Sequence, residues 1–155
     1  MKIYFDHEKL DVYQEAIAFC GWVGEFLTAI SSKAAAKDQL DRASTSIPLN
    51  IAEGNGKFSR RDRARFFQIA HGSALESAAC LDLLVARRCS EPAAIVEGKA
   101  LLGEIVRMLF KLLDNLGCRV AEDCSEYGVA IEEEKEEEEK EEGRGQGERS
   151  RRRRY

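Results

Sequence analysis

Apolar residues recur at steps of three and four positions in four separate stretches of the chain, which is the spacing of one face of an α-helix. The stretches span residues 10–30, 40–51, 66–84 and 101–116, and the links between them are short. Helices joined by short links pack antiparallel to their neighbours. The pattern therefore predicts an all-α fold, an antiparallel four-helix bundle.

Residues that favour helix ends mark the boundaries of these stretches. Asp6 and Ser59 are the expected N-caps of the first and third helices, because their side-chain oxygens can accept a backbone N–H of the first turn. Ser90 is the expected cap of the fourth helix, with Pro92 in its first turn. Gly117 follows the last apolar position and predicts the end of that helix.

Two features of the middle helices predict how they pack. Pro48 lies inside the second stretch, and a proline there removes a hydrogen bond and predicts a kinked helix. The hydroxyls of Ser44, Thr45 and Ser46 are expected to bond to the carbonyls that it leaves free. Residues 72–79 are unusually small, so we expect the third helix to be the central element of a tight bundle.

Composition narrows the class of protein. The 155 residues are enough for one domain, and only 12 Gly and 2 Pro favour long helices over a many-turned β fold. The apolar runs are short, so we expect no membrane span, no signal peptide and a cytoplasmic protein. Five irregularly spaced cysteines are expected to be reduced thiols, and with two histidines they predict no metal site or other cofactor.

The last thirty residues differ in composition from the rest. Nine Glu and two Lys fill residues 132–142, and six Arg and one Glu lie in residues 143–155. The apolar periodicity is absent there, so this charged segment has no face to bury and is predicted to be disordered. We therefore divide the chain into a four-helix bundle at 1–125 and an acidic-then-basic tail at 126–155.

The most informative charge cluster of the bundle is residues 57–65, which hold five cations and one anion around the start of the third helix. Cations there oppose the helix dipole, whereas a bound phosphate would complement it. We expect RNA or DNA to be held through phosphate contacts with Lys57, Arg60, Arg61 and Arg63. The alternative is a solvated basic turn, partly paired with Asp62 or with acids of a neighbouring subunit.

The tail offers further cations. Arg149, Arg151 and Arg152 are candidates for gripping RNA or an acidic protein surface, although the Glu-rich run could equally fold back and mask them. The simplest interpretation of the tail is a solubilising extension. Tyr155 alone does not make an aromatic stacking platform.

Three charged residues lie close to the apolar stripes of the second and third helices. Arg42, Glu53 and Glu76 are expected to form a buried or half-buried structural network that fixes helix register around the kink. General acid–base catalysis by the two carboxylates is the alternative. We predict no catalytic residues and no enzyme activity.

One enzyme alternative comes from another class. Arg65 and His71 have a spacing that resembles the Arg-x(4–6)-His signature of HEPN-type helical nucleases, which cleave RNA without a metal. The spacing is loose, and it lies early in the third helix, whereas that family carries it late in the domain. Packing or surface exposure of His71 is the competing interpretation.

Seven segments carry a resemblance to a known family across about 70% of the chain. They are, in order, residues 10–16, 39–43, 46–48, 50–54, 65–70, 72–76 and 107–109, and they include Gln39-Leu40-Asp41-Arg42-Ala43 and Asn50-Ile51-Ala52-Glu53-Gly54. In these motifs the chain resembles the bacterial four-helix-bundle family first met in intervening sequences of 23S ribosomal RNA genes. The accessory variability determinant of diversity-generating retroelements is related to that family.

The resemblance implies a four-helix protomer assembled as a ring-shaped homopentamer, with no established enzyme activity. The retroelement relatives bind a reverse transcriptase and its template RNA, whereas members encoded within ribosomal RNA genes have no settled role. We therefore expect a non-enzymatic nucleic-acid- and protein-binding accessory factor, in first place an accessory subunit of a retroelement reverse transcriptase. The alternative is a stand-alone intervening-sequence protein that binds RNA. In either case a ring would repeat the basic turn five times on one rim.

Overall fold

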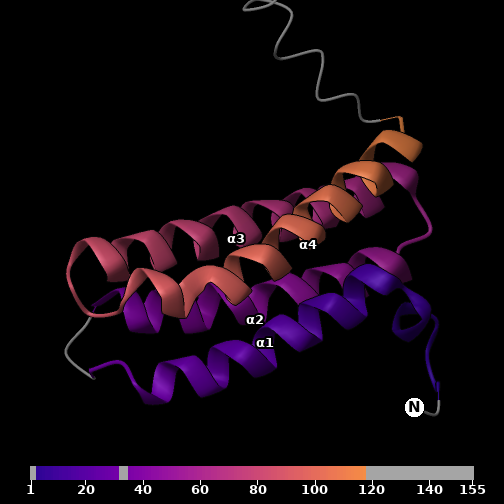
Figure 1. The fold of residues 1–155 in the computed structure, drawn as a ribbon. Coiled ribbons are helices and arrows are strands. Elements are labelled where there is room, and N and C mark those ends of the chain that lie inside the picture. Colours follow the sequence, from indigo (N-terminus) through magenta and orange to yellow (C-terminus); the bar gives the residue numbers. More distant parts are fainter. Residues whose placement is uncertain (1–2, 32–34, 118–155) are drawn as a thin grey trace, which may run out of the picture. The chain divides into compact units, whose positions relative to one another are not determined.

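The computed structural model describes residues 3–31 and 35–117, and within them it contains four long helices and no strand (Figure 1). This confirms the predicted all-α four-helix bundle. The compact unit runs from Met1 to Cys118, and the tail at 126–155 lies outside the described residues. The elements are η1 (Asp6–Lys9), α1 (Asp11–Thr28), α2 (Ala35–Gly56), α3 (Arg60–Ala86), η2 (Pro92–Ile95) and α4 (Val96–Asn115).

Each long helix packs against two others. Helix α1 contacts α2 and α4, and α3 contacts the same two helices, so α1 and α3 lie diagonally across the bundle. The most extensive packing joins α2 to α3. Helix α3 takes part in the two most extensive interfaces, with α2 and with α4, although no helix lies at the centre of the bundle. The small residues of α3 allow one neighbour, α2, to approach closely.

Apolar side chains from all four helices meet in one continuous core. Fully buried positions are spaced along the predicted stripes, and each large side chain contributes about 1.5–3 kcal/mol by leaving water. The largest of them are Phe19, Leu40, Ile47, Ile51, Leu81, Leu84, Leu102, Ile105 and Leu109.

The interface between α2 and α3 also holds a small polar seam. The hydroxyls of Ser46 and Ser73 are 2.9 Å apart, and Asn50 Nδ2 donates to the Ser46 carbonyl at 2.7 Å. Ser77, fully buried, donates to the Ser73 carbonyl at 2.8 Å. Because buried hydroxyls are costly without partners, these bonds make small polar residues acceptable in the core.

Helix α2 continues through Pro48, which is buried. The proline has no N–H for the carbonyl of Ser44, four residues earlier, and the Cys20 thiol of α1 donates to that carbonyl at 3.3 Å. The hydroxyls of Ser44 and Thr45 do bond back along the helix, but to the Asp41 carbonyl and not to the carbonyl that Pro48 leaves free. A side chain of another helix thus replaces part of the lost bond.

The helix ends follow the sequence signals only in part. Ser59 caps α3, with its Oγ accepting from the Asp62 N–H at 3.4 Å, and Gly117 ends α4 with a φ of +79°. Both predictions are confirmed. Ser90 is not the cap of α4. The short helix η2 lies between Ser90 and α4, and the Ser90 hydroxyl donates to the Glu91 carbonyl.

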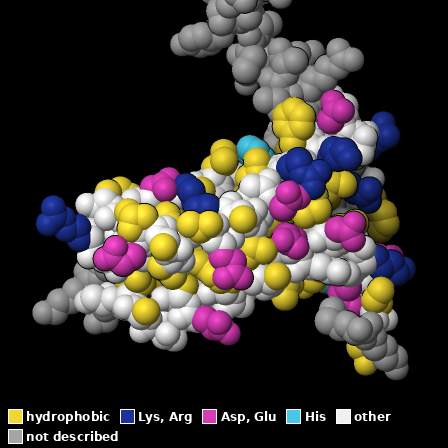
Figure 2. All heavy atoms as spheres, viewed as in Figure 1, with side chains coloured by type: hydrophobic (Ala, Val, Ile, Leu, Met, Phe, Trp, Pro, Cys, Tyr) yellow, Lys and Arg dark blue, Asp and Glu magenta, His cyan; other side chains and the backbone are white. Residues whose placement is uncertain are grey.

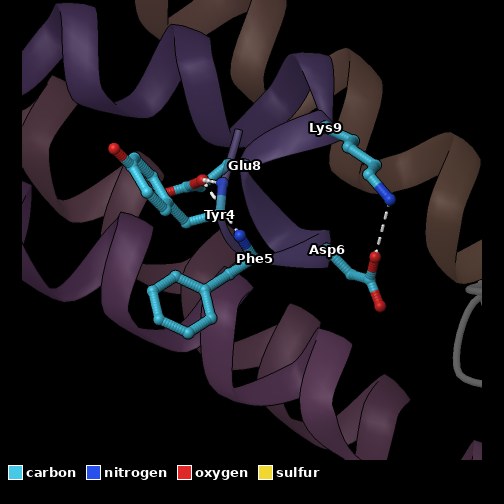
Figure 3. Close-up of polar contacts among 5 residues, drawn as sticks. All are labelled: Tyr4, Phe5, Asp6, Glu8 and Lys9. Atoms are coloured by element: carbon cyan, nitrogen blue, oxygen red, sulfur yellow. Dashed lines mark hydrogen bonds and ion pairs between the residues drawn. The ribbon is translucent and has the colours of Figure 1, made fainter. Parts of the chain in front are cut away.

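Asp6 does not cap α1 either, because the chain forms the short helix η1 first. The backbone N–H groups of Tyr4 and Phe5 donate to the Glu8 carboxylate, at 2.6 Å and 3.1 Å (Figure 3). These bonds lower the pKa of Glu8. Asp6 instead pairs with Lys9 at 2.8 Å, which lowers the pKa of its carboxyl. Local side-chain bonds therefore hold the approach to α1.

Helix α3 is long and apolar enough, by length and composition alone, to cross a membrane. The expectation that no segment has this property is therefore wrong. Alanine accounts for much of its apolar content, and Ala64, Ala70 and Ala74 are buried within the bundle. This is also the composition of a core helix that packs closely against its neighbours.

Trp22 on α1 meets α4 at Gly98. Its ring stacks against Phe26 at a centroid distance of 4.9 Å and against Phe19 at 5.9 Å. A Cβ atom at Gly98 would overlap the Trp22 ring, whereas one at Gly103 would meet nothing within 4 Å. The absence of a side chain at Gly98 therefore sets the approach of α1 to α4.

Substitution of these two glycines on one helix tests this packing. We expect Gly98→Ala to lower the free energy of unfolding by about 1–3 kcal/mol, because the stacked Trp22 ring cannot move aside freely. Gly103→Ala should raise it by about 0.5–1 kcal/mol, because alanine is the better helix former and the position is open. Urea unfolding of both variants measures the difference, and equal midpoints would contradict the packing.

Candidate nucleic-acid interface

Four element ends meet at one end of the bundle. Because the helices run antiparallel, this end combines the starts of α1 and α3 with the ends of α2 and α4 (Figure 1). Lys and Arg side chains gather toward it on the face drawn in Figure 2, over the C-terminal half of α4, with Asp and Glu side chains among them. We call it the basic end and define it by Lys57, Arg60, Arg61, Arg63, Arg65, Arg107 and Lys111.

Three arginines of the first turns of α3 line an open groove. Arg60, Arg61 and Arg65 are exposed, and they share the groove with Gln68 and with Leu116 of α4. None of the three side chains makes a hydrogen bond or ion pair within residues 3–31 and 35–117. Three guanidinium groups and one carboxylate, Asp62, therefore face solvent together.

The dipole of α3 makes this placement unfavourable without an anion. Positive side chains near the first turn oppose the partial positive charge of the helix N-terminus. A phosphate would complement both the guanidinium groups and that dipole. The groove is therefore suited to a phosphate-bearing ligand.

Arg63 and Lys57 have structural partners, contrary to the expectation that they are free phosphate contacts. One guanidinium nitrogen of Arg63 donates to the carbonyls of Asn55, at 3.4 Å, and Lys57, at 3.1 Å, and its Nε is buried. Lys57 Nζ pairs with Glu53 at 3.0 Å and lies 4.7 Å from the Phe66 ring centroid. Counting charged residues in the sequence does not show that Arg63 bonds to these backbone carbonyls.

The network predicted for Arg42, Glu53 and Glu76 is present only in part. The Gln39 side chain bridges Arg42 and Glu76, accepting from the first and donating to the second. Glu53 instead pairs with Lys57. All three charged residues are exposed, so the predicted burial is wrong. Solvated carboxylates of this kind also lack the burial on which the acid–base alternative depended.

Arg65 and His71 do not share one side of α3. Six residues at 100° each place them about 120° apart around the helix axis and about 9 Å apart along it. Arg65 is exposed, and His71 is half-buried. One protomer therefore does not bring the Arg65 and His71 side chains together. A nuclease site would need one of the two residues from a second copy of the chain.

The basic end has a second groove, which was not predicted from the sequence. It lies between the start of α1 and the last turns of α4 and contains three cations, Lys9, Arg107 and Lys111. Lys9 pairs with Asp6 and Arg107 with Glu104, which leaves Lys111 without an ion pair in the described part of the chain. The four-residue spacing of Arg107 and Lys111 on one helix was the signal that could have revealed this groove.

The described residues provide no metal-binding cluster of three or more His, Cys, Asp or Glu side chains. Among them Cys20, Cys80 and Cys89 are free thiols, and burial raises the pKa of Cys20 and of Cys80. Cys118, Cys124 and the candidate tail residues Arg149, Arg151 and Arg152 lie outside the described residues.

A family model for the 23S rRNA-intervening sequence protein matches residues 8–111, which span the helices that build both grooves. The chain belongs to this family. No curated protein matches the chain. The relation to retroelement accessory proteins that the sequence motifs implied is not shown by these comparisons.

A solved structure has the same fold. It is a protein with unknown function from the S23 ribosomal protein family of Bacteroides thetaiotaomicron, and it matches 66% of this chain and 97% of its own chain. The TM-score is 0.62 at 22% sequence identity. At that identity the similarity shows the four-helix fold of this family member and carries no residue roles.

The two kinds of arginine at the basic end predict different effects on stability. Arg63→Ala should lower the free energy of unfolding by about 1–3 kcal/mol, because it leaves helix-end carbonyls without a charged donor. Arg60→Ala should change it by less than about 0.5 kcal/mol, because that side chain is exposed and has no partner among the described residues. Urea unfolding of both variants provides the measurement, and equal effects would remove the distinction.

Proposed function

We propose that this member of the family is a non-enzymatic nucleic-acid-binding protein that holds RNA by its phosphates at the basic end of the bundle. The single observation that supports this is the groove lined by Arg60, Arg61 and Arg65, whose guanidinium groups make no ion pair within the described residues, although Asp62 lines the same groove. Such contacts are strong in low salt and weak in high salt, and they do not depend on the nucleotide sequence of the RNA.

The family match favours a stand-alone intervening-sequence protein over an accessory subunit of a reverse transcriptase. The matched residues, 8–111, lie in the bundle, and the family is named after intervening sequences of 23S ribosomal RNA. A reverse transcriptase as partner has no support among these findings, so we take RNA as the ligand. DNA would offer the same phosphates, and the preference between them is an outcome of the binding measurements.

Self-association would strengthen the proposed binding. One groove makes few phosphate contacts, whereas several copies on one assembly would hold a single RNA with the advantage of multivalency. We include a homopentamer, as the family resemblance implies, in this proposal. Arg149, Arg151 and Arg152 of the tail are proposed to add a further, non-specific attraction.

Charge reversal at the groove tests the proposal. We expect Arg60→Glu combined with Arg61→Glu to weaken binding of a hairpin RNA about tenfold or more, because two phosphate contacts become repulsions. The slope of log affinity against log salt concentration should fall by about 1 for each lost contact. Filter binding at several salt concentrations gives both quantities.

The matched control reverses two arginines at the opposite end of α3. Arg87→Glu combined with Arg88→Glu changes the net charge equally, and both residues are exposed. Its binding should stay within about twofold of wild type if position matters more than net charge. Equal losses in the two double variants would contradict a defined site. Cleavage of the RNA that disappears in His71→Ala would instead support the nuclease alternative.

A further inference from the structure

Phe58 is the most exposed large apolar residue of the described chain, at 104% of its reference area. It lies in the turn between α2 and α3, where its ring contributes nothing to the core. A single exposed apolar residue carries no argument by itself, since such residues are common. Its surroundings decide what the ring can do.

The backbone on both sides of Phe58 is held in place. Arg63 donates to the Lys57 carbonyl at 3.1 Å, and the Lys57 N–H donates to the Gly54 carbonyl at 3.2 Å. On the other side Ser59 caps α3. A ring carried by a fixed turn loses little conformational freedom when it binds a flat partner, which favours binding.

Two positively charged side chains lie within three residues after Phe58. Arg60 and Arg61 are exposed and line the groove, and neither makes an ion pair within the described ranges. A nucleotide carries a flat base and a charged phosphate within one unit. An aromatic ring beside free guanidinium groups therefore matches a strand whose bases are unpaired.

Phe5 provides an internal comparison, because it is also exposed, at 64%, in the short segment before α1. Its ring already stacks on His7, with centroids 5.8 Å apart and planes 9° from parallel. Its chain neighbours Asp6 and Glu8 are acidic: the Glu8 carboxylate accepts from the Phe5 N–H, and Asp6 turns toward Lys9 (Figure 3). Cations without an ion pair in the described residues follow Phe58, whereas Lys9, the cation that follows Phe5, is paired with Asp6.

We infer that Phe58 stacks on a base of single-stranded RNA while Arg60 and Arg61 hold the adjacent phosphates. This inference rests on the proposed function and narrows its ligand to RNA with unpaired nucleotides. In a duplex the bases stack on one another, so their faces are closed to a protein ring and only the phosphates remain. The basic end therefore distinguishes single strands from duplex through Phe58.

Substitution of Phe58 with two RNA probes tests the inference. For an oligouridine single strand, Phe58→Ala should weaken binding about fivefold to a hundredfold, which is the usual effect of losing one base-stacking ring. For a blunt RNA duplex of the same length, binding should change by less than about twofold, because phosphate contacts remain. Phe58→Trp should retain single-strand binding, and Phe5→Ala, the matched control, should leave both affinities unchanged.

Cross-linking gives evidence that does not depend on affinity. Irradiation of full-length protein with a 5-iodouridine strand should attach the base to the peptide that contains Phe58. Unchanged single-strand binding in Phe58→Ala, with a loss in Arg60→Glu plus Arg61→Glu, would overturn this inference and leave the proposed function standing. No loss in either variant would overturn both. A fall in particle mass by light scattering with unchanged RNA binding would make Phe58 a protein contact and overturn the stacking role.

Discussion

The close approach of α2 and α3 is the constraint on which the rest of the molecule depends. Gly54, in the last turn of α2, is buried, and a Cβ atom there would lie 2.8 Å from the Phe67 ring of α3. Only hydrogen fits at that position without a shift of the Phe67 ring or of the helices. The approach also lets Ser46 and Ser73 share a hydrogen bond. It brings the end of α2 within reach of Arg63, which then secures the turn that leads into α3.

The proline of α2 shows how the bundle accommodates a local defect. Helix α2 continues through Pro48 without the bond to the Ser44 carbonyl, and the Cys20 thiol supplies a donor from α1. Burial raises the pKa of Cys20, so the sulfur remains protonated at neutral pH and able to donate. Thiols are weak donors, and the contact replaces only part of the lost bond. The result ties α1 to the middle of α2.

Charge at the basic end has two separate uses. Arg63 and Lys57 turn inward to carbonyls, to a carboxylate and to an aromatic ring, and they stabilise the turn. Arg60 and Arg61 are exposed, make no ion pair within the described residues, and follow the fully exposed Phe58 in the chain. Arg63 and Lys57 hold the turn in place. Because the turn is fixed, the exposed arginines and Phe58 present a fixed arrangement to a ligand. Stability and recognition thus depend on adjacent residues with opposite orientations.

The sequence by itself determined the four helices, the cap at Ser59 and the end at Gly117, because these depend on periodicity and on bonds within a few residues. It also located the basic segment at 57–65. Only the tertiary structure decided which of those cations are free, because the carbonyls that attract Arg63 and the ring beneath Lys57 come together only when α2 and α3 pack. The same holds for Cys20 and Pro48, 28 positions apart. Interactions between helices follow from packing, which periodicity along one chain does not encode.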